Sequence, residues 1–288
     1  MKRALLPALI LLAAKSPAAA DERADRVREW SKPMPAFRVL DNLYYVGTAE
    51  LASFLLATRH GLVLVDSGIE ESGAEIAASI RALGFEPADI ELIVNSQAHY
   101  DHAAGLAALK EASGARLAAS AGDAPLLEAG GRGDFAFGDR HPFPPVKVDV
   151  RVADGQALTV GDTTLVARLT PGHTEGTTTW LVTLREAGRA LRVVIAGSTA
   201  VNPGVRILDN PKYPAMLDDF ERTFAVFRSL PCDVLLAQHA GLFGLHEKRA
   251  RLAAGRANPF VDAEGCRTAL AGAEARFREQ VAEERAGK

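Results

Sequence analysis

Four side chains that can donate to a metal ion stand within the stretch NSQAHYDHAAG, which runs from residue 95 to residue 105. They are Gln97, His99, Asp101 and His102. Imidazole nitrogens and carboxylate oxygens are common ligands of Zn²⁺. A single histidine after a strand is more often a structural hydrogen-bonding residue than a ligand, but a packed run of this kind is hard to explain by packing alone. The stretch therefore predicts a metal site.

Two further histidines follow predicted strands in the same way. His173 lies in LTPGHTEGT, just past a strand that ends near residue 169, and His239 lies in LLAQHAG, just past a strand that ends near residue 237. Ligands of α/β proteins gather where strands end along one edge of a sheet. We therefore expect these two histidines to join the donors of the first stretch.

The elements that must position these donors follow from the hydrophobic patterning. Short alternating or β-branched runs predict strands at residues 37–40, 43–47, 53–58, 61–66, 90–94, 115–120, 146–154, 156–160, 163–169, 177–183, 191–197 and 233–237. Helical periodicity predicts helices at 71–83, 103–112, 215–229 and 266–284. The Gly-, Pro- and Phe-rich residues 123–145 predict a long irregular segment, of the kind that often carries function. Both halves of the chain thus predict sheets covered by helices.

The first twenty residues have the layout of a secretory signal peptide. A basic start, an apolar run over residues 4–14 and small residues at Ala18 and Ala20 predict cleavage after Ala20. A membrane anchor is the alternative, but the run is shorter than the ~20 residues that span a bilayer. We expect an exported, periplasmic protein whose residues 21–288 form a single domain.

The composition limits the partners. The chain has 288 residues, 48% of them hydrophobic and 24% charged, as in ordinary globular proteins. Cleavage after Ala20 would leave 30 basic against 36 acidic residues. Because no basic cluster stands out, a nucleic-acid partner is not expected, and no later apolar run predicts a membrane span. We expect a monomer that acts on a small molecule.

Cys232 and Cys266 are the two cysteines of the sequence. In an exported protein an even number of cysteines favours a disulfide, which would close a loop worth roughly 3–4 kcal/mol in the chain-entropy model. A pair of metal thiolates is the weaker alternative, because neither cysteine has another type of ligand close by.

The HYDH run, followed by TPGHTEGT and a late QHAG, resembles the metallo-β-lactamase superfamily across essentially the whole mature chain. The resemblance implies an αββα sandwich with a dinuclear metal site at one edge of the paired sheets. Three narrower features resemble the third subclass of the class B β-lactamases: the predicted signal peptide, the spacing of the two cysteines, and the segments GSTAVNPG (197–204) and CDVLLAQHAGLF (232–243). No cysteine lies near the first of these segments, where the other two subclasses carry a metal-binding thiol.

By this resemblance, two Zn²⁺ ions would bind to matched positions. Gln97, His99 and His173 would hold the first, and Asp101, His102 and His239 the second. Gln97 departs from the commoner histidine, and an amide oxygen is a weaker donor for Zn²⁺ than imidazole. The first site should therefore bind zinc less tightly, unless Gln97 turns away and water takes its place.

The same resemblance implies a metal-bound hydroxide that Asp101 orients toward a β-lactam carbonyl. Ser198, Thr199 and Asn202 are candidates for binding the substrate carboxylate, although a turn could equally use them as local caps. Asp66 resembles a position that supports the ligands, or else caps a turn.

Two other positions bear on the cleft. Val205 stands where relatives often have a tyrosine, so a hydroxyl that could assist the developing oxyanion is absent. His141 and Phe143 are candidates for one wall of the cleft.

Two other functions remain open. The same scaffold could serve a glyoxalase II-like thioesterase or an acyl-homoserine lactonase, although export, the paired cysteines and Gln97 argue against them. A non-catalytic, exported zinc-binding protein is the alternative from another class, and Gln97 and Val205 are the residues that would favour it.

Overall fold

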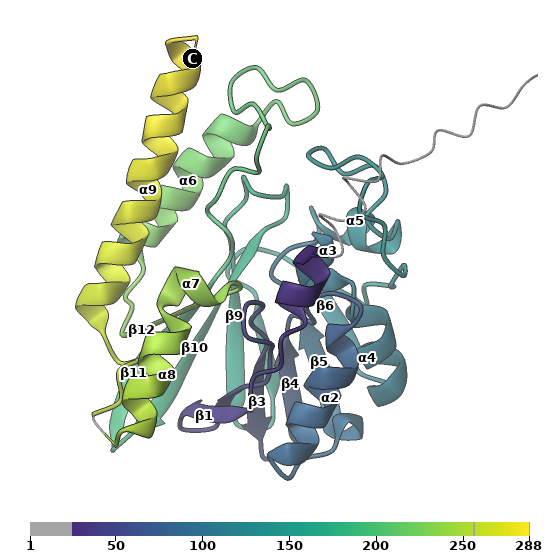
Figure 1. The fold of residues 1–288 in the computed structure, drawn as a ribbon, viewed down its shortest axis with the longest axis vertical. Coiled ribbons are helices and arrows are strands. Elements are labelled where there is room, and N and C mark those ends of the chain that lie inside the picture. The colour runs from purple at the N-terminus through teal and green to yellow at the C-terminus, as the bar shows by residue number, and fades with distance from the viewer. Residues whose placement is uncertain (1–24, 256, 288) are drawn as a thin grey trace, which may run out of the picture.

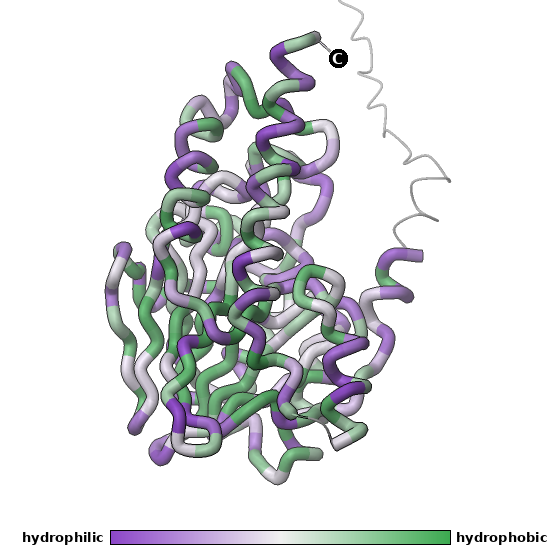
Figure 2. Tube along the Cα trace, turned by 90° about the vertical axis from the view of Figure 1, so that its left-hand side faces the viewer, coloured by the Kyte–Doolittle hydropathy of each residue, from purple (hydrophilic) through white to green (hydrophobic). Residues whose placement is uncertain are grey.

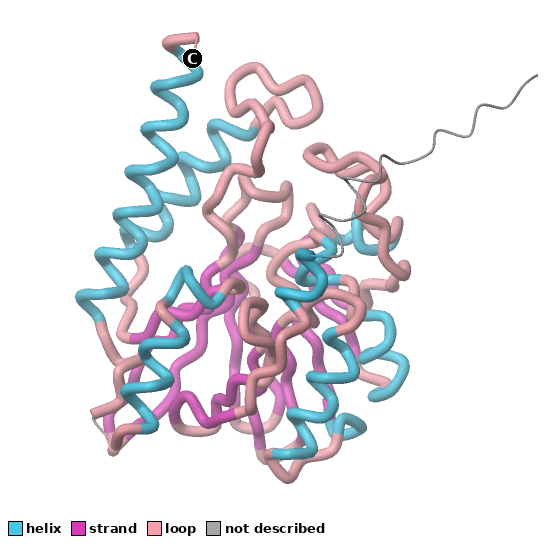
Figure 3. The backbone as a smooth tube through the Cα atoms, in the orientation of Figure 1, coloured by secondary structure: helices cyan, strands magenta, loops and turns pink. Residues whose placement is uncertain are grey.

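The structure is a computed structural model that describes residues 25–255 and 257–287. The predicted signal peptide lies outside the described residues. Twelve strands are described: β1 Phe37–Leu40, β2 Leu43–Tyr45, β3 Phe54–Thr58, β4 Gly61–Val65, β5 Ile90–Val94, β6 Arg116–Ser120, β7 Val150–Val152, β8 Ala157–Val160, β9 Thr163–Leu169, β10 Thr178–Glu186, β11 Arg189–Ala196 and β12 Val234–Ala237 (Figures 1 and 3).

Helices flank these strands on the outside. They are α2 Ser72–Ala82, α3 Tyr100–Ala103, α4 Leu106–Ser113, α5 Ala124–Glu128, α6 Met216–Ser229, α7 Ala240–Phe243, α8 Leu245–Ala253 and α9 Ala263–Arg285, with a 3₁₀ turn η1 at Pro87–Asp89. A helical turn over residues 25–30 precedes β1.

The strands form two sheets. The first has the order β1-β2-β3-β4-β5-β6-β7, and the second has the order β12-β11-β10-β9-β8. In the first sheet β4, β5, β6 and β7 are parallel neighbours, and in the second β11 and β12 are parallel. The carboxyl ends of parallel neighbours meet at one edge of a sheet, so the loops after β4, β5 and β12 leave the sheets where a site can form.

Alternation along the strands produces four layers. In β5, Leu92 and Val94 face the core between the sheets, whereas Ile93 faces the helices α2 and α4. In β11, Val193 belongs to the same central core and Val194 to the core beneath α6 and α9. Successive side chains of a strand point to opposite faces, so each sheet is buried on both sides.

These layers form the αββα sandwich that we expected. Figure 1 shows α6 and α9 side by side over one sheet and α2 and α4 over the other. In Figure 2 the strands inside the body are largely hydrophobic, while hydrophilic positions recur along the outer helices.

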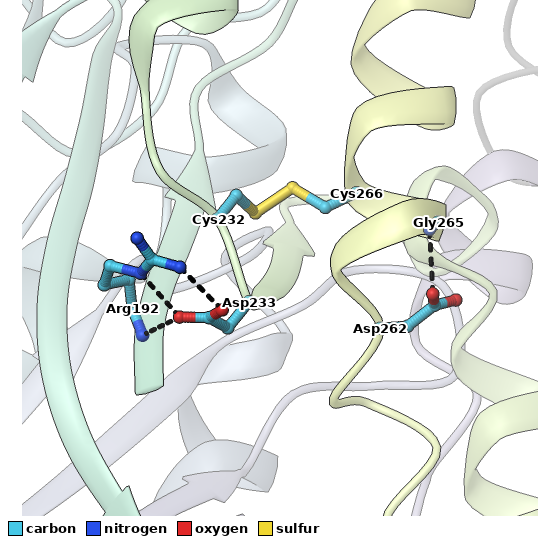
Figure 4. Close-up of a disulfide and its surroundings, with 6 residues drawn as sticks. All are labelled: Arg192, Cys232, Asp233, Asp262, Gly265 and Cys266. Carbon is cyan, nitrogen blue, oxygen red and sulfur yellow. Dashed lines mark hydrogen bonds and ion pairs between the residues drawn. A yellow bond between two sulfur atoms is a disulfide. The ribbon is translucent and has the colours of Figure 1, made fainter. Parts of the chain in front are cut away.

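The predicted disulfide is present. Cys232, which precedes β12, is bonded to Cys266 in the first turn of α9 (Figure 4). The bond therefore attaches the long C-terminal helix to the start of the strand that leads to His239.

Most predicted elements are confirmed within a few residues. The predicted strand 146–154 shortens to β7, and the predicted helix 103–112 divides into α3 and α4. The segment 123–145 is irregular except for α5. The patterning did not identify α7, α8 or the helical turn over residues 25–30.

Candidate metal centre

Three strand ends bring the donors together, as the sequence predicts. The stretch 95–102 follows β5, His173 follows β9, and His239 follows β12. Backbone contacts join these ends across the two sheets, since the Thr178 amide donates to the Ser96 carbonyl (2.7 Å) and the Ala52 amide to the Gln238 carbonyl (2.7 Å). The site therefore lies where both sheets end, near the starts of α3 and α7, which stand just above the strands in Figure 1.

Asp101, His102 and His239 form a compact group. The Nε2 atoms of the two histidines lie 3.2 Å apart, and Asp101 Oδ2 lies 3.3 Å from His102 Nε2 and 3.4 Å from His239 Nε2. Tetrahedral Zn²⁺ with ligands at 2.0–2.1 Å separates neighbouring donor atoms by about 3.3 Å. The spacing of these three donors thus fits a zinc ion.

A second group lies beside it. His99 Nδ1 is 3.0 Å from His173 Nε2, and the two rings meet edge to face. Gln97 is 1% exposed, and its Oε1 atom has no hydrogen-bond partner within the described part of the chain. A buried amide oxygen without a partner is unfavourable, so this group also fits a cation.

Other groups fix the two imidazoles of this second group. The Ala200 carbonyl lies 2.7 Å from His173 Nδ1, which leaves Nε2 to face His99. Asp134 Oδ2 lies 3.2 Å from His99 Nε2, a close contact that is not an aligned hydrogen bond, and His99 Nδ1 faces His173. Such partners set which ring nitrogen is free to bind a metal.

The protonation of the site follows from burial and charge. Burial alone would raise the pKa of Asp101, but His102 and His239 outweigh it and hold that pKa well below 3.8. Burial would lower the pKa of His102, yet the carboxylate of Asp101 raises it. Burial, together with the charge of His99, lowers the pKa of His173 to about 3. His173 is therefore neutral at pH 7, the form that binds a metal.

Asp66 lies beneath the ligand loop rather than against an imidazole. Its Oδ1 accepts from the Ser96 amide (2.7 Å) and the Asn95 side chain (3.0 Å), and its Oδ2 accepts from the Ser96 hydroxyl (2.5 Å). Gln238 donates to the same hydroxyl from the other sheet (3.2 Å). Asp66 thus supports the segment that carries the donors, and its bonds do not reach the rings directly.

A cleft opens above the donors. Of the three candidates for binding the substrate carboxylate, Ser198 and Asn202 line this cleft. Thr199 lines a neighbouring hollow against α9. Its contact with a substrate stays a prediction.

The aromatic wall differs from the one we expected. His141 lines the cleft, but Phe143 is 5% exposed and packs in the core beneath the loop. Phe137 lines the cleft instead, with its ring 4.8 Å from that of His99. Trp30, from the N-terminal helical turn, also lines the cleft, beside His239 (6.1 Å between ring centroids). No periodicity in the sequence marked these two residues.

Within the described ranges, none of the helices combines the length and the apolar character that crossing a bilayer requires.

Known proteins share this architecture. The model of the metallo-beta-lactamase superfamily matches residues 51–239. The metallo-β-lactamase of Cronobacter sakazakii with an HARLDQ motif is 43% identical, with 90% of this chain and 98% of that chain covered and a TM-score of 0.86. FEZ-1 metallo-β-lactamase from Legionella gormanii is 38% identical, with 88% and 98% covered and a TM-score of 0.87.

BJP-1, a subclass B3 metallo-β-lactamase of Bradyrhizobium japonicum, is 37% identical, with 91% of this chain and 98% of that chain covered and a TM-score of 0.85. A hydroxyacylglutathione hydrolase of Cereibacter sphaeroides is 37% identical over 78 residues, so the chain spans only 24% of the length of that curated relative. The family match, together with the shared fold, the coverage of both chains and the sequence identity to these solved structures, shows that the chain belongs to the metallo-β-lactamase superfamily, within its subclass B3.

Proposed function

We propose that this protein is a zinc-dependent hydrolase that opens the β-lactam ring of antibiotics and so confers resistance. The observation that carries the proposal is that side chains from three strand ends gather at one edge of the sandwich in two groups, His99 with His173 and Asp101 with His102 and His239. Solved structures titled metallo-β-lactamases share this fold at 37–43% identity.

Two zinc ions per chain are proposed. Gln97, His99 and His173 would hold the first, and Asp101, His102 and His239 the second. The 3.2–3.4 Å separations among the second set and the buried, unpartnered Oε1 of Gln97 in the first support this assignment. Three protein ligands per ion leave positions open for substrate and water, as in catalytic zinc sites.

Bound zinc would polarise the lactam carbonyl and make water acidic enough to react near pH 7. The residues of this chain then orient the reactants. Asp101 directs Oδ2 at both second-site imidazoles, and we assign its other oxygen the role of accepting a hydrogen bond from the attacking water. The Ala200 carbonyl fixes the His173 ring and Asp134 lies beside His99 Nε2, so the two nitrogens that face each other are the ones free to bind the first zinc.

The cleft suits an amphipathic, anionic substrate. Ser198 and Asn202 offer a hydroxyl and an amide to a carboxylate, while Trp30, Phe137 and Leu242 present apolar surface to side groups. Thr199 remains a third candidate for the carboxylate.

We also propose export to the periplasm and a monomeric state. The basic, apolar and small-residue layout of residues 1–20 supports export. The disulfide agrees with an oxidising compartment.

A chelator-controlled hydrolysis panel tests the function. Purified protein with measured zinc content is assayed with a chromogenic cephalosporin, a carbapenem and a glutathione thioester, alongside His239→Ala. We expect hydrolysis of the lactams that chelator abolishes and His239→Ala loses. Preferential hydrolysis of the thioester would instead support the thioesterase alternative. The 78-residue match to the hydroxyacylglutathione hydrolase is the observation that favours this alternative. Bound zinc without any hydrolysis would support a non-catalytic zinc-binding protein.

A further inference from the structure

Asp123 is a buried carboxylate to which the proposed chemistry assigns no role. It is 3% exposed and stands immediately before α5. An aspartate at this position ordinarily caps the helix by accepting from its first amides. Here the side chain makes no capping hydrogen bond. It turns inward, toward the metal centre.

The carboxylate joins two ligand-bearing loops. Its Oδ2 accepts from the Ala98 amide (3.0 Å) and from the Thr174 hydroxyl (2.9 Å), and its Oδ1 accepts from the Gly176 amide (2.9 Å). Ala98 stands between Gln97 and His99, and Thr174 directly follows His173. The Asp123 side chain therefore binds a residue adjacent to each of the three proposed ligands of the first zinc: Ala98 is adjacent to Gln97 and His99, and Thr174 is adjacent to His173.

The surroundings leave this contact little freedom. A Cβ atom on Gly176 would lie 2.2 Å from the Asp123 amide nitrogen and 2.0 Å from Ser120 Oγ, so only glycine allows the loops to approach this closely. Ser120 Oγ in turn accepts from the Asp123 amide (3.1 Å). Burial raises the pKa of Asp123, and the three donors that face its two oxygens compensate the burial of the carboxylate.

We propose that Asp123 is a positioning residue that fixes the separation between the Gln97–His99 segment and His173. It thereby pre-organises the first zinc site. The inference rests on the proposed ligand assignment. Gln97 is a weak donor, so this site depends more than an all-imidazole site would on having its ligands in place before the metal binds. Asp101, His102 and His239 lie outside the contacts of Asp123, so the second site should not depend on it.

The test measures each zinc site separately. Zinc affinity is determined by competition with a chromophoric chelator in His239→Ala protein, which keeps the first ligand set, and in His173→Ala protein, which keeps the second. Asp123→Asn replaces one acceptor oxygen by a donor that faces an N–H or O–H group. We expect it to lower first-site affinity by about tenfold or more and to leave second-site affinity unchanged.

Two matched variants separate positioning from general stability. Asp149→Asn weakens another loop-holding carboxylate, which accepts from the Leu117 amide and from Lys110, and should leave both zinc affinities unchanged. Thr174→Val removes one of the three donors to Asp123, whereas Thr174→Ser keeps the hydroxyl. We expect Thr174→Val to lower the zinc affinity of the first site severalfold and Thr174→Ser to leave it unchanged. If Asp123→Asn does not fold, the comparison of Thr174→Val with Thr174→Ser still tests whether Asp123 positions the first zinc site.

Several outcomes would overturn the inference. Folded Asp123→Asn protein with wild-type first-site affinity is one, and an equal loss at both sites is another, since it would indicate general loosening. Thr174→Val protein that binds zinc as tightly as Thr174→Ser is a third. If the His239→Ala protein with Asp123 intact binds no zinc, the ligand assignment itself is wrong, and that result is distinct from the other three.

Discussion

Gln97 is the residue at which this chain departs from a ligand set made of imidazoles and a carboxylate. Its oxygen is buried and unpartnered, which favours a ligand over a side chain turned toward water. We predict that Gln97→His raises first-site zinc affinity on the order of tenfold, because imidazole is the stronger donor for Zn²⁺. Zinc stoichiometry at rising free zinc measures the change, with the second site as internal control. An unchanged first site would mean that Gln97 is not a ligand.

Residue type alone was enough to propose the metal donors but not to identify the groups around them. His99, His173 and His239 stand out because an imidazole after a strand end carries a chemical signal. Asp123 carries no such signal, because an aspartate before a helix is the ordinary N-cap. Only the approach of two loops distant in sequence turns it toward the site. Phe137 and Phe143 were likewise indistinguishable in a segment without periodicity.

The C-terminal helix α9 holds the segment that lines the cleft. Glu284, in its last turn, accepts from the Ile207 amide (2.8 Å) and the Leu208 amide (2.9 Å), five and six residues beyond Asn202. Hydrogen bonds to a charged group are worth about 1.5–3 kcal/mol each. We predict that Glu284→Gln loosens this segment, accelerates amide hydrogen exchange at both amides and raises KM severalfold with little change in zinc content.

The neighbouring exposed Glu283 provides the control for this prediction. Glu283→Gln removes the same charge from the same turn and should change neither exchange nor KM. Equal effects of the two substitutions would assign the result to charge and not to the hydrogen bonds of Glu284.

The pair Arg192 and Asp233 joins β11 to the start of β12 (Figure 4). Hydrogen bonds from Arg192 lower the pKa of Asp233 from 3.8 to about 2. The folded-state pKa lies below the unfolded one, so the stabilisation is complete above about pH 4 and is lost as pH falls toward 2. Because the Arg192 side chain is 53% exposed, solvent screening keeps the contribution of this pair to stability small.

We therefore predict that Arg192→Gln lowers the free energy of unfolding of metal-free protein slightly but measurably at pH 7 and by much less at pH 2.5. Urea unfolding of both proteins at the two pH values provides the comparison. If Arg192→Gln lowers the free energy of unfolding equally at the two pH values, the ionised carboxylate of Asp233 is not the source of the stabilisation.

At the scale of single elements, the hydrophobic pattern predicted those helices and strands whose buried faces make apolar residues recur at a regular spacing. The strand at 90–94 and the helix at 215–229 alternate or repeat because each buries one or two faces. The short helices α7 and α8 follow His239 and bury few residues, so they leave little periodic signal. Their positions depend on tertiary contacts, which local sequence does not encode.

At the scale of the whole molecule, the two sheets contribute the site in unequal shares. The first sheet supplies four of the six donors from one loop, and the second supplies His173 and His239 from two separate loops. Each proposed ligand set takes residues from both sheets, so any relative movement of the sheets would split both sets. At the site the two sheets are joined through Ser96, whose carbonyl accepts from the Thr178 amide and whose hydroxyl accepts from Gln238. The disulfide instead joins α9 to the start of β12 in the second sheet.

The disulfide should therefore affect stability more than chemistry. Cys232 and Cys266 are separated by 34 residues, and closing a loop of this size restricts the unfolded chain by roughly 3–4 kcal/mol. We predict that Cys232→Ser/Cys266→Ser lowers the free energy of unfolding by about that amount, while zinc content and kcat below the unfolding transition stay near those of the parent. Denaturant unfolding and metal analysis on the same preparation measure both quantities. If the fully folded double variant loses zinc, the disulfide must act on the ligands directly, through the strand that leads from Cys232 to His239.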